Sequence, residues 1–322
     1  MLQFSTLKLA VRLLLWIRWL QKRWEMGSSA MSGLGAFAEI IRENQSLAPF
    51  TWLQIGGLVR YLVEPNDEAQ LQAVVKCCAT ASISMRVLGG GSNLLIRESG
   101  LDGAALSLSS PGFGQMKRMD DRIVCGAGAK LSHLVAFSVG AGLGGLEHLV
   151  GIPGTVGGAL RCNSGMDDGD IGLMVDSARL MTKEGQIVEV RGAELAFSHR
   201  VSSLDELVIL EATFRLGPGD VRSLTKREQT FWIVKRAKQP NFPERAAIAF
   251  VDPDGYKASE LLGQSGFNGA IEGAVRLSSR YPNYLIASNN ATSTQVLELV
   301  ERVSKGVLDR CGVQLQLHLQ IW

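Results

Sequence analysis

The chain has 322 residues, of which 46% are hydrophobic and 20% charged, a composition typical of a globular protein and not of a disordered one. Its length favours two or three packed units over one small core. The formal net charge of +2 depends on five basic residues that precede the first acid, Glu25; without them, 28 basic residues remain against 31 acidic ones. This balance argues against a nucleic-acid binder.

Residues 1–24 combine those basic residues with three tryptophans, but their longest uncharged apolar stretch, residues 13–17, is too short to span a bilayer. Two interpretations stay open. Residues 1–31 are either a basic amphipathic extension that makes weak contact with a membrane surface, or a mis-assigned start before Met26 or Met31.

Cysteine and histidine usage indicates a reduced, cytoplasmic protein without a metal site. The five cysteines are odd in number and show no CxxC or other metal-ligand spacing. The four histidines are widely separated, which argues against a His-rich metal centre.

The first half of the chain predicts one βαβ unit followed by a glycine-rich crossing. Its expected elements are a helix over 34–44, strands over 52–55 and 61–63 around a Gly56-Gly57 turn, a helix over 67–80 and a strand over 85–96.

From residue 101 short strands dominate, and no internal repeat is present. We expect strands over 104–107, 122–125, 175–182, 186–190 and 207–215, with helices over 130–141 and 156–164. After a turn-rich boundary at 216–220 the expected elements are a charged helix over 221–237, a loop over 238–253, helices over 257–265 and 293–311, and strands over 283–287 and 313–321.

Three glycines, Gly89, Gly90 and Gly91, follow an apolar strand directly and precede Ser92 and Asn93. Consecutive residues without Cβ atoms let backbone N–H groups converge on an anion, and the hydroxyl and amide add donors. The segment therefore predicts a phosphate-binding loop, with a tight turn at positive φ as the alternative.

A second glycine-rich segment, "GIPGTVGGALRCNSG", follows the same logic. A helix that starts near Pro153 would present free N–H groups to phosphate, and its small residues would let a ring or pyrophosphate lie close. Two such loops fit a dinucleotide. The predicted ligands from this segment are Gly151, Pro153, Gly154, Thr155, Gly157, Gly158 and Asn163.

A third segment, "GAGLGG" at 140–145, formally matches GxGxxG. It follows a helical stretch and not a strand, so the strand–turn–helix context of a Rossmann NAD site is missing. We therefore do not expect NAD to bind there.

These motifs, together with "TWLQIGGLVRYLVEP", "FSHRVS", "AKQPNFP" and "GVQLQLHLQIW", occur in the order and spacing of the bacterial UDP-N-acetylenolpyruvoylglucosamine reductases. The chain resembles this family from about residue 45 to 322. The resemblance implies an α+β fold, with an FAD-binding domain of the vanillyl-alcohol-oxidase type over 45–217, in subdomains of about 45–110 and 111–217. A smaller α+β substrate-binding domain over 221–322 follows.

The resemblance also implies the activity: NADPH reduces non-covalent FAD, hydride passes to the enolpyruvyl β-carbon of a sugar nucleotide, and an acid protonates the α-carbon. The product is UDP-N-acetylmuramate for peptidoglycan. His148, beside "GIPG", is a less favoured site for covalent flavin. Gln239 and Asn283 are implied substrate ligands.

The family's catalytic residues match only in part. Arg200 in "FSHRVS" corresponds to the arginine that stabilises the enolate. A fixed guanidinium that faces a developing carboxylate-enolate charge stabilises the transition state electrostatically. Ile248 stands in place of the proton-donating serine and has no proton to donate. His318 replaces the glutamate of the closing strand, and histidine is able to act as a general acid.

Two alternatives follow from this partial match. Besides the reductase activity, the chain could be a flavoprotein that binds a sugar nucleotide with impaired turnover, or a flavin oxidoreductase for another substrate.

Overall fold

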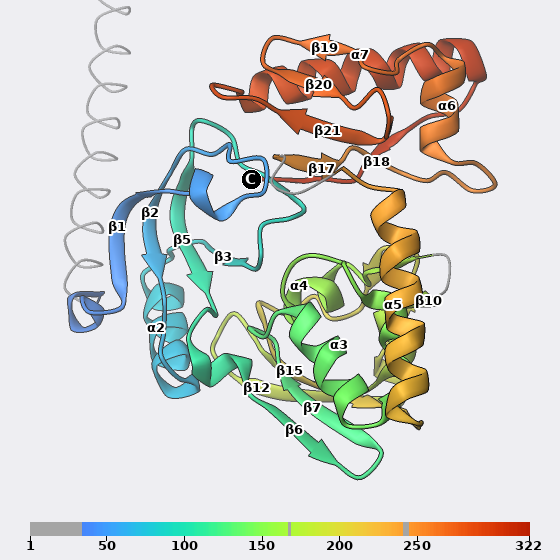
Figure 1. The fold of residues 1–322 in the computed structure, drawn as a ribbon. Helices are drawn as coiled ribbons and strands as arrows, with labels where there is room; N and C mark the ends of the chain where they lie inside the picture. Colours follow the sequence, from blue (N-terminus) through green and yellow to red (C-terminus); the bar gives the residue numbers. More distant parts are fainter. Residues whose placement is uncertain (1–33, 167–168, 241–244) are drawn as a thin grey trace, which may run out of the picture.

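The computed structural model describes residues 34–166, 169–240 and 245–322. Each of three units is built around its own sheet, and the third unit lies above the other two in Figure 1. The prediction for residues 1–31 lies outside the described residues. No helix in the described part of the chain is long and apolar enough to cross a bilayer.

The first unit is a four-stranded sheet in the order β1-β2-β5-β3, covered by α2. β5 runs parallel to both β2 and β3, so it separates the two strands of the predicted βαβ unit. Asp67 caps α2 by accepting a hydrogen bond from the Gln70 amide, as its position before the helix predicts. The elements are β1 (Ile41–Ser46), β2 (Leu58–Val63), α2 (Glu68–Thr80), β3 (Met85–Leu88) and β5 (Leu101–Ser107).

Three predictions for this unit are wrong. The helix over 34–44 is a short 3₁₀ turn, η1 (Gly35–Phe37), followed by β1, because the free edge of β2 pairs with these residues. The strand over 52–55 is a turn closed by the Thr51 hydroxyl, which bonds both backbone groups of Ile55. The strand over 85–96 breaks into β3 and β4 (Leu94–Leu95), because Gly91 turns the backbone with a φ of +65°.

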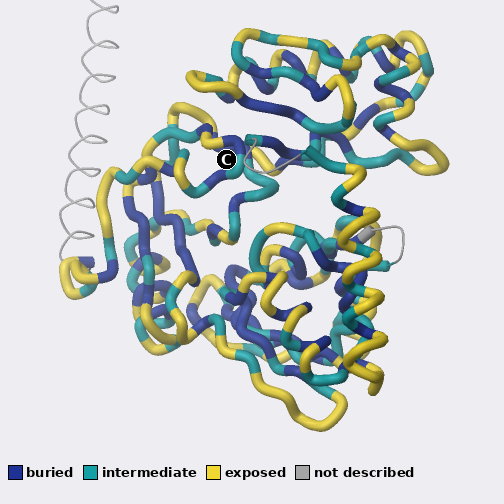
Figure 2. The backbone as a smooth tube through the Cα atoms, viewed as in Figure 1, coloured by how far each residue is buried: buried dark blue, intermediate teal, exposed yellow. Residues whose placement is uncertain are grey.

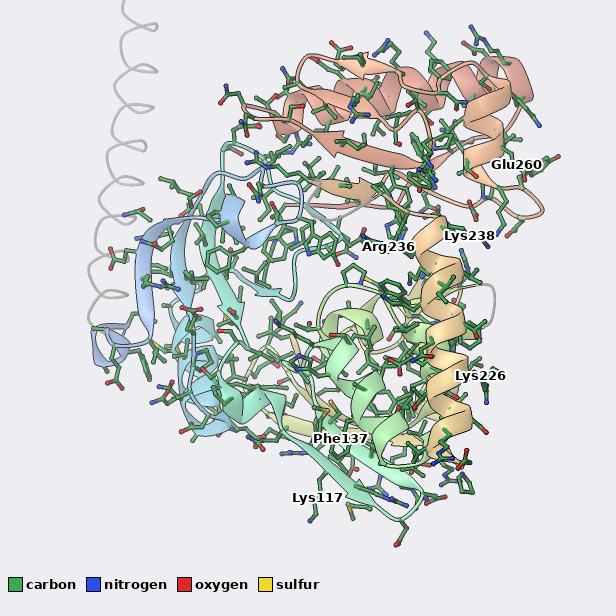
Figure 3. All side chains as sticks on the ribbon, viewed as in Figure 1. Lys117, Phe137, Lys226, Arg236, Lys238 and Glu260 are labelled. Carbon is green, nitrogen blue, oxygen red and sulfur yellow. The ribbon has the colours of Figure 1, made fainter. Side chains whose placement is uncertain are left out.

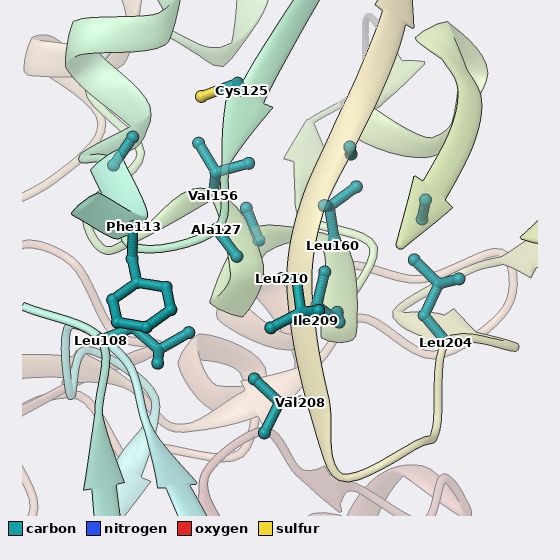
Figure 4. Close-up of a cluster of buried hydrophobic side chains, with 14 of the residues drawn as sticks. Leu108, Phe113, Cys125, Ala127, Val156, Leu160, Leu204, Val208, Ile209 and Leu210 are labelled. Carbon is teal, nitrogen blue, oxygen red and sulfur yellow. The ribbon is translucent and has the colours of Figure 1, made fainter. Parts of the chain in front are cut away.

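The second unit is an antiparallel five-stranded sheet in the order β12-β11-β15-β7-β6. The helix α4 packs on β15 and β7, and its Val156 and Leu160 join Ala127 and Leu210 in the buried cluster of Figure 4. The elements are β6 (Met116–Met119), β7 (Arg122–Gly126), α3 (Leu131–Gly140), α4 (Val156–Arg161), β11 (Val175–Met181), β12 (Ile187–Arg191) and β15 (Val208–Arg215).

The helix α5 (Val221–Ala237) runs along the outside of this unit, and its bounds agree with the prediction. It contacts α3 and the 3₁₀ turn η4 (Glu147–Leu149), although the expected boundary assigns 221–237 to the following domain. The remaining short strands are β8 (Leu143–Gly144), β9 (Gly165–Met166), β10 (Gly169–Asp170), β13 (Phe197–Ser198), β14 (Val201–Ser202) and β16 (Gly217–Pro218).

The third unit is a sheet in the order β17-β21-β20-β19, covered by the long helix α7. Thr292 and Gln295 form a capping box at the start of α7, and Gly312 ends the helix in the left-handed region. The elements are β17 (Ala246–Ile248), α6 (Ala258–Gln264), β19 (Ile271–Glu272), β20 (Val275–Leu277), β21 (Tyr284–Ala287) and α7 (Ser293–Cys311).

Two further predictions for this unit need correction. The expected loop over 238–253 contains β17 and β18 (Phe250–Val251), because strands far away in the sequence pair with both. The expected closing strand over 313–321 is two short strands, β22 (Gln316–Leu317) and β23 (Gln320–Ile321), which pair with different partners.

The third unit is joined to the first by the end of the chain. β23 pairs in parallel with β4, and Glu98 accepts hydrogen bonds from the amide and hydroxyl of Ser293 at the start of α7. Figure 2 shows that the buried segments follow the sheets, while α5 and the outer loops are largely exposed. The fold is α+β, as expected, and the three units meet around a common centre.

Candidate functional site

A cleft of about 830 Å³ lies where the three units meet, and residues from each unit line it. We call it the central cleft. Both glycine-rich loops open into it, although more than 50 residues separate them in the sequence. The predicted site residues that line it are Gly89, Gly90, Gly91, Ser92, Asn93, Gly151, Pro153, Gly154, Thr155, Gly157, Gly158, Arg200, Gln239 and His318.

Several glycines lack a side chain because another backbone segment approaches them. A Cβ atom on Gly90 would lie 2.6 Å from the Cα atom of Gly154, so the two glycine-rich loops pack directly against each other. A Cβ atom on Gly157 would lie 2.9 Å from that of Ala127. The expectation that these glycines make room for a ligand is therefore only partly right.

The start of α4 is not the free anion site that the sequence suggests. The Val156 and Gly157 amides donate to the carbonyls of Ala129 and Ala127, and the Gly158 amide donates to the Thr155 hydroxyl at 3.2 Å. The helix start therefore has its amides bonded within the protein.

The loop 89–93 offers the donors instead. In the described part of the chain, no hydrogen bond uses a backbone amide of residues 89–93 as donor. The Asn93 side-chain oxygen Oδ1 is buried without a hydrogen-bond partner among the described residues, although Asn93 lines the central cleft. The free backbone amides fit the phosphates of a dinucleotide cofactor. Buried polar atoms are usually paired, so the Oδ1 atom, which is an acceptor, fits a hydroxyl or N–H group of the same cofactor.

Gly158 is the glycine whose missing side chain opens space toward the cleft. A Cβ atom there would meet only the Thr155 hydroxyl oxygen, at an ordinary 3.4 Å, and the residue is helical and exposed.

We expect Gly158→Ala to leave the free energy of unfolding unchanged or to raise it by up to about 1 kcal/mol, because alanine favours a helix. The added methyl group should weaken FAD binding by about 1–3 kcal/mol, roughly 5- to 150-fold. Flavin fluorescence titration and urea unfolding measure the two effects. Unchanged flavin affinity would contradict this placement of the cofactor.

The central cleft is strongly basic. Asp252 is the one acidic residue among the described residues that line it, and it is paired with Lys257 at 3.1 Å. Such a surface favours ligands with several negative charges. The basic lining residues are Lys130, Arg161, Arg200, Lys235, Arg236, Lys238 and Lys257.

Three of these residues come from the end of α5. Figure 3 shows Arg236 and Lys238 at the end of this helix that faces the third unit. Lys235 lies one residue earlier and is buried. The sequence pattern indicates only a charged helix over 221–237 and does not single out Lys235. The one available signal was the position of Lys235 three residues before the predicted loop over 238–253.

Arg200 is held at the tip of the hairpin formed by β13 and β14. Ser198 pairs with Val201, which leaves His199 and Arg200 as the turn, and Arg200 has a φ of +59°. A non-glycine residue in this region is strained, and such residues concentrate at functional sites. The hairpin thus presents the guanidinium to the cleft.

Ile248 lines the same cleft at the position of the family serine. It lies in β17 directly opposite Tyr284 of β21, and Tyr284 also lines the cleft. Burial and the neighbouring Tyr281 raise the pKa of Tyr284 to about 12. Arg200, Ile248 and His318 thus line one cavity.

His318 lies between β22 and β23 and has a buried Nδ1 atom without a hydrogen-bond partner among the described residues. Burial, together with the positive charges of Arg200 and His199, lowers its pKa to about 4. The imidazole is therefore neutral at pH 7, which weakens the expectation that it is the proton donor.

His318 should also make the fold acid-sensitive. Its pKa is about 4 in the folded chain and near 6.5 when unfolded, so its contribution to stability is complete above pH 6.5 and is lost as the pH falls toward 4. We expect wild type to lose on the order of 2 kcal/mol more than His318→Gln between pH 7 and 4.5. Urea unfolding at both pH values measures this, and equal losses would refute it.

Two predicted ligands lie outside the cleft lining. Asn163 bonds the Ser198 carbonyl at 2.7 Å and the Gly172 amide at 3.1 Å, which ties α4 to the hairpin of Arg200. Asn283 bonds both backbone groups of Phe250, at 2.9 and 2.8 Å. Both side chains hold neighbouring segments of the site in place.

The two alternative cofactor positions do not meet the cleft. His148 is not among its lining residues in the described chain, and its ring instead approaches Phe231 of α5, with centroids 6.5 Å apart. The segment 140–145 begins at the last residue of α3, so it follows a helix and not a strand. Neither feature offers a flavin or NAD site.

Comparisons with known proteins agree with this geometry. A family model described as "FAD binding domain" matches residues 59–191, and one described as "UDP-N-acetylenolpyruvoylglucosamine reductase, C-terminal domain" matches 239–322. A UDP-N-acetylenolpyruvoylglucosamine reductase of Rhodopirellula baltica is 45% identical over 283 residues, which cover 88% of this chain and 93% of the relative. One from Methylorubrum extorquens is 33% identical, over 86% of this chain and 90% of the relative.

A solved structure shows the same fold. The UDP-N-acetylenolpyruvylglucosamine reductase of Thermus caldophilus superposes with a TM-score of 0.76 at 28% identity and covers 88% of this chain and 99% of its own.

Proposed function

Because the chain belongs to the UDP-N-acetylenolpyruvoylglucosamine reductases, we propose that it reduces UDP-N-acetylglucosamine enolpyruvate to UDP-N-acetylmuramate with NADPH. The protein is a flavin-dependent oxidoreductase, and its product is a peptidoglycan precursor. The single observation that carries the proposal is the basic central cleft, in which the free amides of the loop 89–93 and Arg200 open into one cavity.

FAD would be held non-covalently by the loop 89–93, with Gly158 leaving space beside it. The bound flavin supplies hydride transfer, taking two electrons from NADPH and giving them to the substrate. The free amides would bind the pyrophosphate, and the Asn93 Oδ1 atom would accept a hydrogen bond from a hydroxyl or N–H group of the cofactor. The close packing of Gly90 on Gly154 fixes the two loops relative to each other.

Arg200 would orient the enolpyruvyl group and stabilise the negative charge that develops on its carboxylate. Gln239 and the basic side chains at the end of α5 are suited to the uridine diphosphate, since they line the same cleft. Asn163 and Asn283 would act indirectly, because their side chains are bonded within the fold.

The test is to supply the purified FAD-loaded chain with NADPH and UDP-N-acetylglucosamine enolpyruvate. We expect NADPH consumption that depends on the sugar nucleotide, and a product two mass units heavier than the substrate. NADPH oxidation without that product would show that the substrate assignment is wrong.

A second candidate is a flavoprotein that binds the sugar nucleotide with impaired turnover. Ile248 in the cleft favours it, because this side chain cannot protonate a carbanion. Loss of a general acid typically costs about 10²–10⁴ in rate. Binding of the sugar nucleotide, seen as a change in the flavin spectrum, without NADPH consumption would support this candidate.

A cytoplasmic location and contact of residues 1–24 with a membrane surface both stay predictions. The basic residues and tryptophans of that segment support surface contact.

A further inference from the structure

Lys235 is the most unusual basic group in the central cleft. It lies in the last turn of α5, with 9% of its surface exposed. Its aliphatic stem packs over Gly151, where an added Cβ atom would lie 3.2 Å from the lysine Cδ atom. Gly151 has a φ of +72°, so the loop that begins the second glycine-rich segment turns here and leaves room for the lysine.

No side-chain hydrogen bond or ion pair joins Lys235 to any described residue, and Arg200 is close enough to act on its charge. A buried ammonium without a counter-ion is costly. The same side chain lines the cleft that receives an anionic substrate. The cost is therefore removed either when the amine loses its proton or when a negatively charged group enters the cleft.

The acid that lines the cleft and the acid of the turn that contacts α5 are each paired with another cation. Glu147 of η4, the turn that contacts α5, is paired with Arg227 at 3.3 Å and also accepts from the Gly145 amide. Asp252 in the third unit is paired with Lys257.

The other titratable groups that surround the cleft near Lys235 are neutral or basic. Arg200 of the hairpin, Arg236 and Lys238 at the end of α5, and His318 of the third unit line the cleft. His133 of α3 and His148 of η4 belong to elements that contact α5, and His199 precedes Arg200 in the hairpin turn. Burial, and then the charge of Arg200, lower the pKa of Lys235 to about 7. An amine with this pKa exchanges its proton readily at neutral pH.

We propose that the Lys235 ammonium donates the proton that the α-carbon of the substrate receives, in place of the serine hydroxyl that Ile248 lacks. The inference rests on the proposed function, because it assigns a residue to the second half of that reaction. It names a catalytic residue that the resemblance does not supply.

The proposed step balances in atoms and electrons. When hydride bonds to the β-carbon, the electron pair of the enolpyruvyl double bond moves to the α-carbon and is shared with the carboxylate, which Arg200 faces. An N–H bond of Lys235 then breaks, its electron pair stays on nitrogen, and the proton forms the new C–H bond at the α-carbon. The neutral amine regains a proton from water before the next turnover.

Three other groups that line the cleft are less suited to this role. His318 has a pKa of about 4 and is neutral at pH 7. Tyr284 lies opposite Ile248 in the sheet, but its pKa of about 12 means that it exchanges its proton at neutral pH less readily than Lys235 does. Arginine holds its proton permanently in proteins, so Arg200 stabilises charge and does not donate.

The decisive variant is Lys235→Arg, which keeps the positive charge but cannot donate a proton at neutral pH. We expect reoxidation of the reduced flavin by UDP-N-acetylglucosamine enolpyruvate, and kcat, to fall about 10²-fold or more. KM and the rate of flavin reduction by NADPH should change little. A role limited to anion binding would instead leave kcat near the wild-type value, and that result would overturn the proposal.

The pH profile gives a second readout, independent of the size of the rate loss. The donor must be protonated, so kcat/KM of wild type should fall tenfold per pH unit above about pH 7. This alkaline limb of the pH profile should be absent from the residual activity of Lys235→Arg. Persistence of the limb in the variant would overturn the proposal. Tyr284→Phe is the matched control, and a larger loss in this variant than in Lys235→Arg would assign the proton to the tyrosine.

A third readout needs no turnover. The rate of acetylation of Lys235 by acetic anhydride, followed by mass spectrometry across pH, reports the pKa of the amine, and an ordinary value near 10.5 would refute the proposal. Failure of the proposed function would give a different result from failure of the proton-donor assignment, because the reduced flavin of the wild-type protein would itself not be reoxidised by the sugar nucleotide. In that case the proton-donor assignment falls with it.

Discussion

Replacing Arg200 with glycine is expected to lower kcat/KM for UDP-N-acetylglucosamine enolpyruvate by about 10²–10³. The same change should leave the free energy of unfolding unchanged, or raise it by up to about 1 kcal/mol. The two effects differ in sign because Arg200 occupies a turn position with a φ of +59°, which glycine adopts without strain. Arg200 thus costs some stability through its strained backbone, and it places a guanidinium at the cleft.

The loss has a specific physical origin. The cleft has one acidic residue among its described lining residues, so little negative charge competes for the Arg200 guanidinium. A fixed guanidinium in such a site stabilises a developing carboxylate-enolate charge far better than it would in water. Arg200→Lys should recover only part of the activity, because an ammonium cannot hold a carboxylate through two parallel bonds.

Arg200 also sets the acidity of its neighbours. Its charge lowers the pKa of both Lys235 and His318, although burial contributes more in each case. Removing it should raise the pKa of Lys235 and move the alkaline limb of the pH profile to higher pH. Steady-state kinetics across pH, with urea unfolding of both variants, measures all of these effects. An Arg200→Gly protein with wild-type kcat/KM would show that Arg200 does not contact the reacting group.

Replacing Gly91 with alanine is expected to destabilise the chain by about 2–5 kcal/mol and to abolish flavin retention. A Cβ atom on Gly91 would lie 1.8 Å from the carbonyl oxygen of Phe50, and the residue has a φ of +65°. The backbone must therefore move, and the free amides of the loop 89–93 move with it.

Gly140→Ala provides the matched control. Gly140 ends α3 at negative φ, and nothing lies within 4 Å of the Cβ position. The control should keep both stability and flavin, measured by urea unfolding and by the 450 nm absorbance of the purified protein. If Gly91→Ala retained the same molar ratio of FAD to protein as the wild type, the loop 89–93 would not be the phosphate-binding loop.

Elements with strong local signals were predicted well from the sequence. The bounds expected for α5 and α7 agree with the structure, because Asp220 caps the start of α5 and both ends of α7 carry capping residues. The expected α+β fold is also confirmed. The errors occur where pairing between distant segments decides the structure. β1 forms because β2 offers a free edge, and the two short closing strands pair with partners at least 65 residues away in the sequence.

The sequence predicted individual segments of the site, but it did not predict how these segments pack together. Glycine-rich loops, Arg200 and His318 carry sequence signals, and the structure brings them together. No local pattern indicates that Gly90 packs on Gly154, or that the amides at the start of α4 are bonded internally. The lowered pKa of Lys235 arises from burial and from Arg200, and both depend on the tertiary fold.

The most direct test of the central claim is an anaerobic stopped-flow experiment on the FAD-loaded wild-type chain. NADPH should bleach the 450 nm absorbance, and UDP-N-acetylglucosamine enolpyruvate should then restore it at a rate that saturates with substrate. Colour that stays bleached after addition of this sugar nucleotide, and returns only with oxygen, would contradict the account.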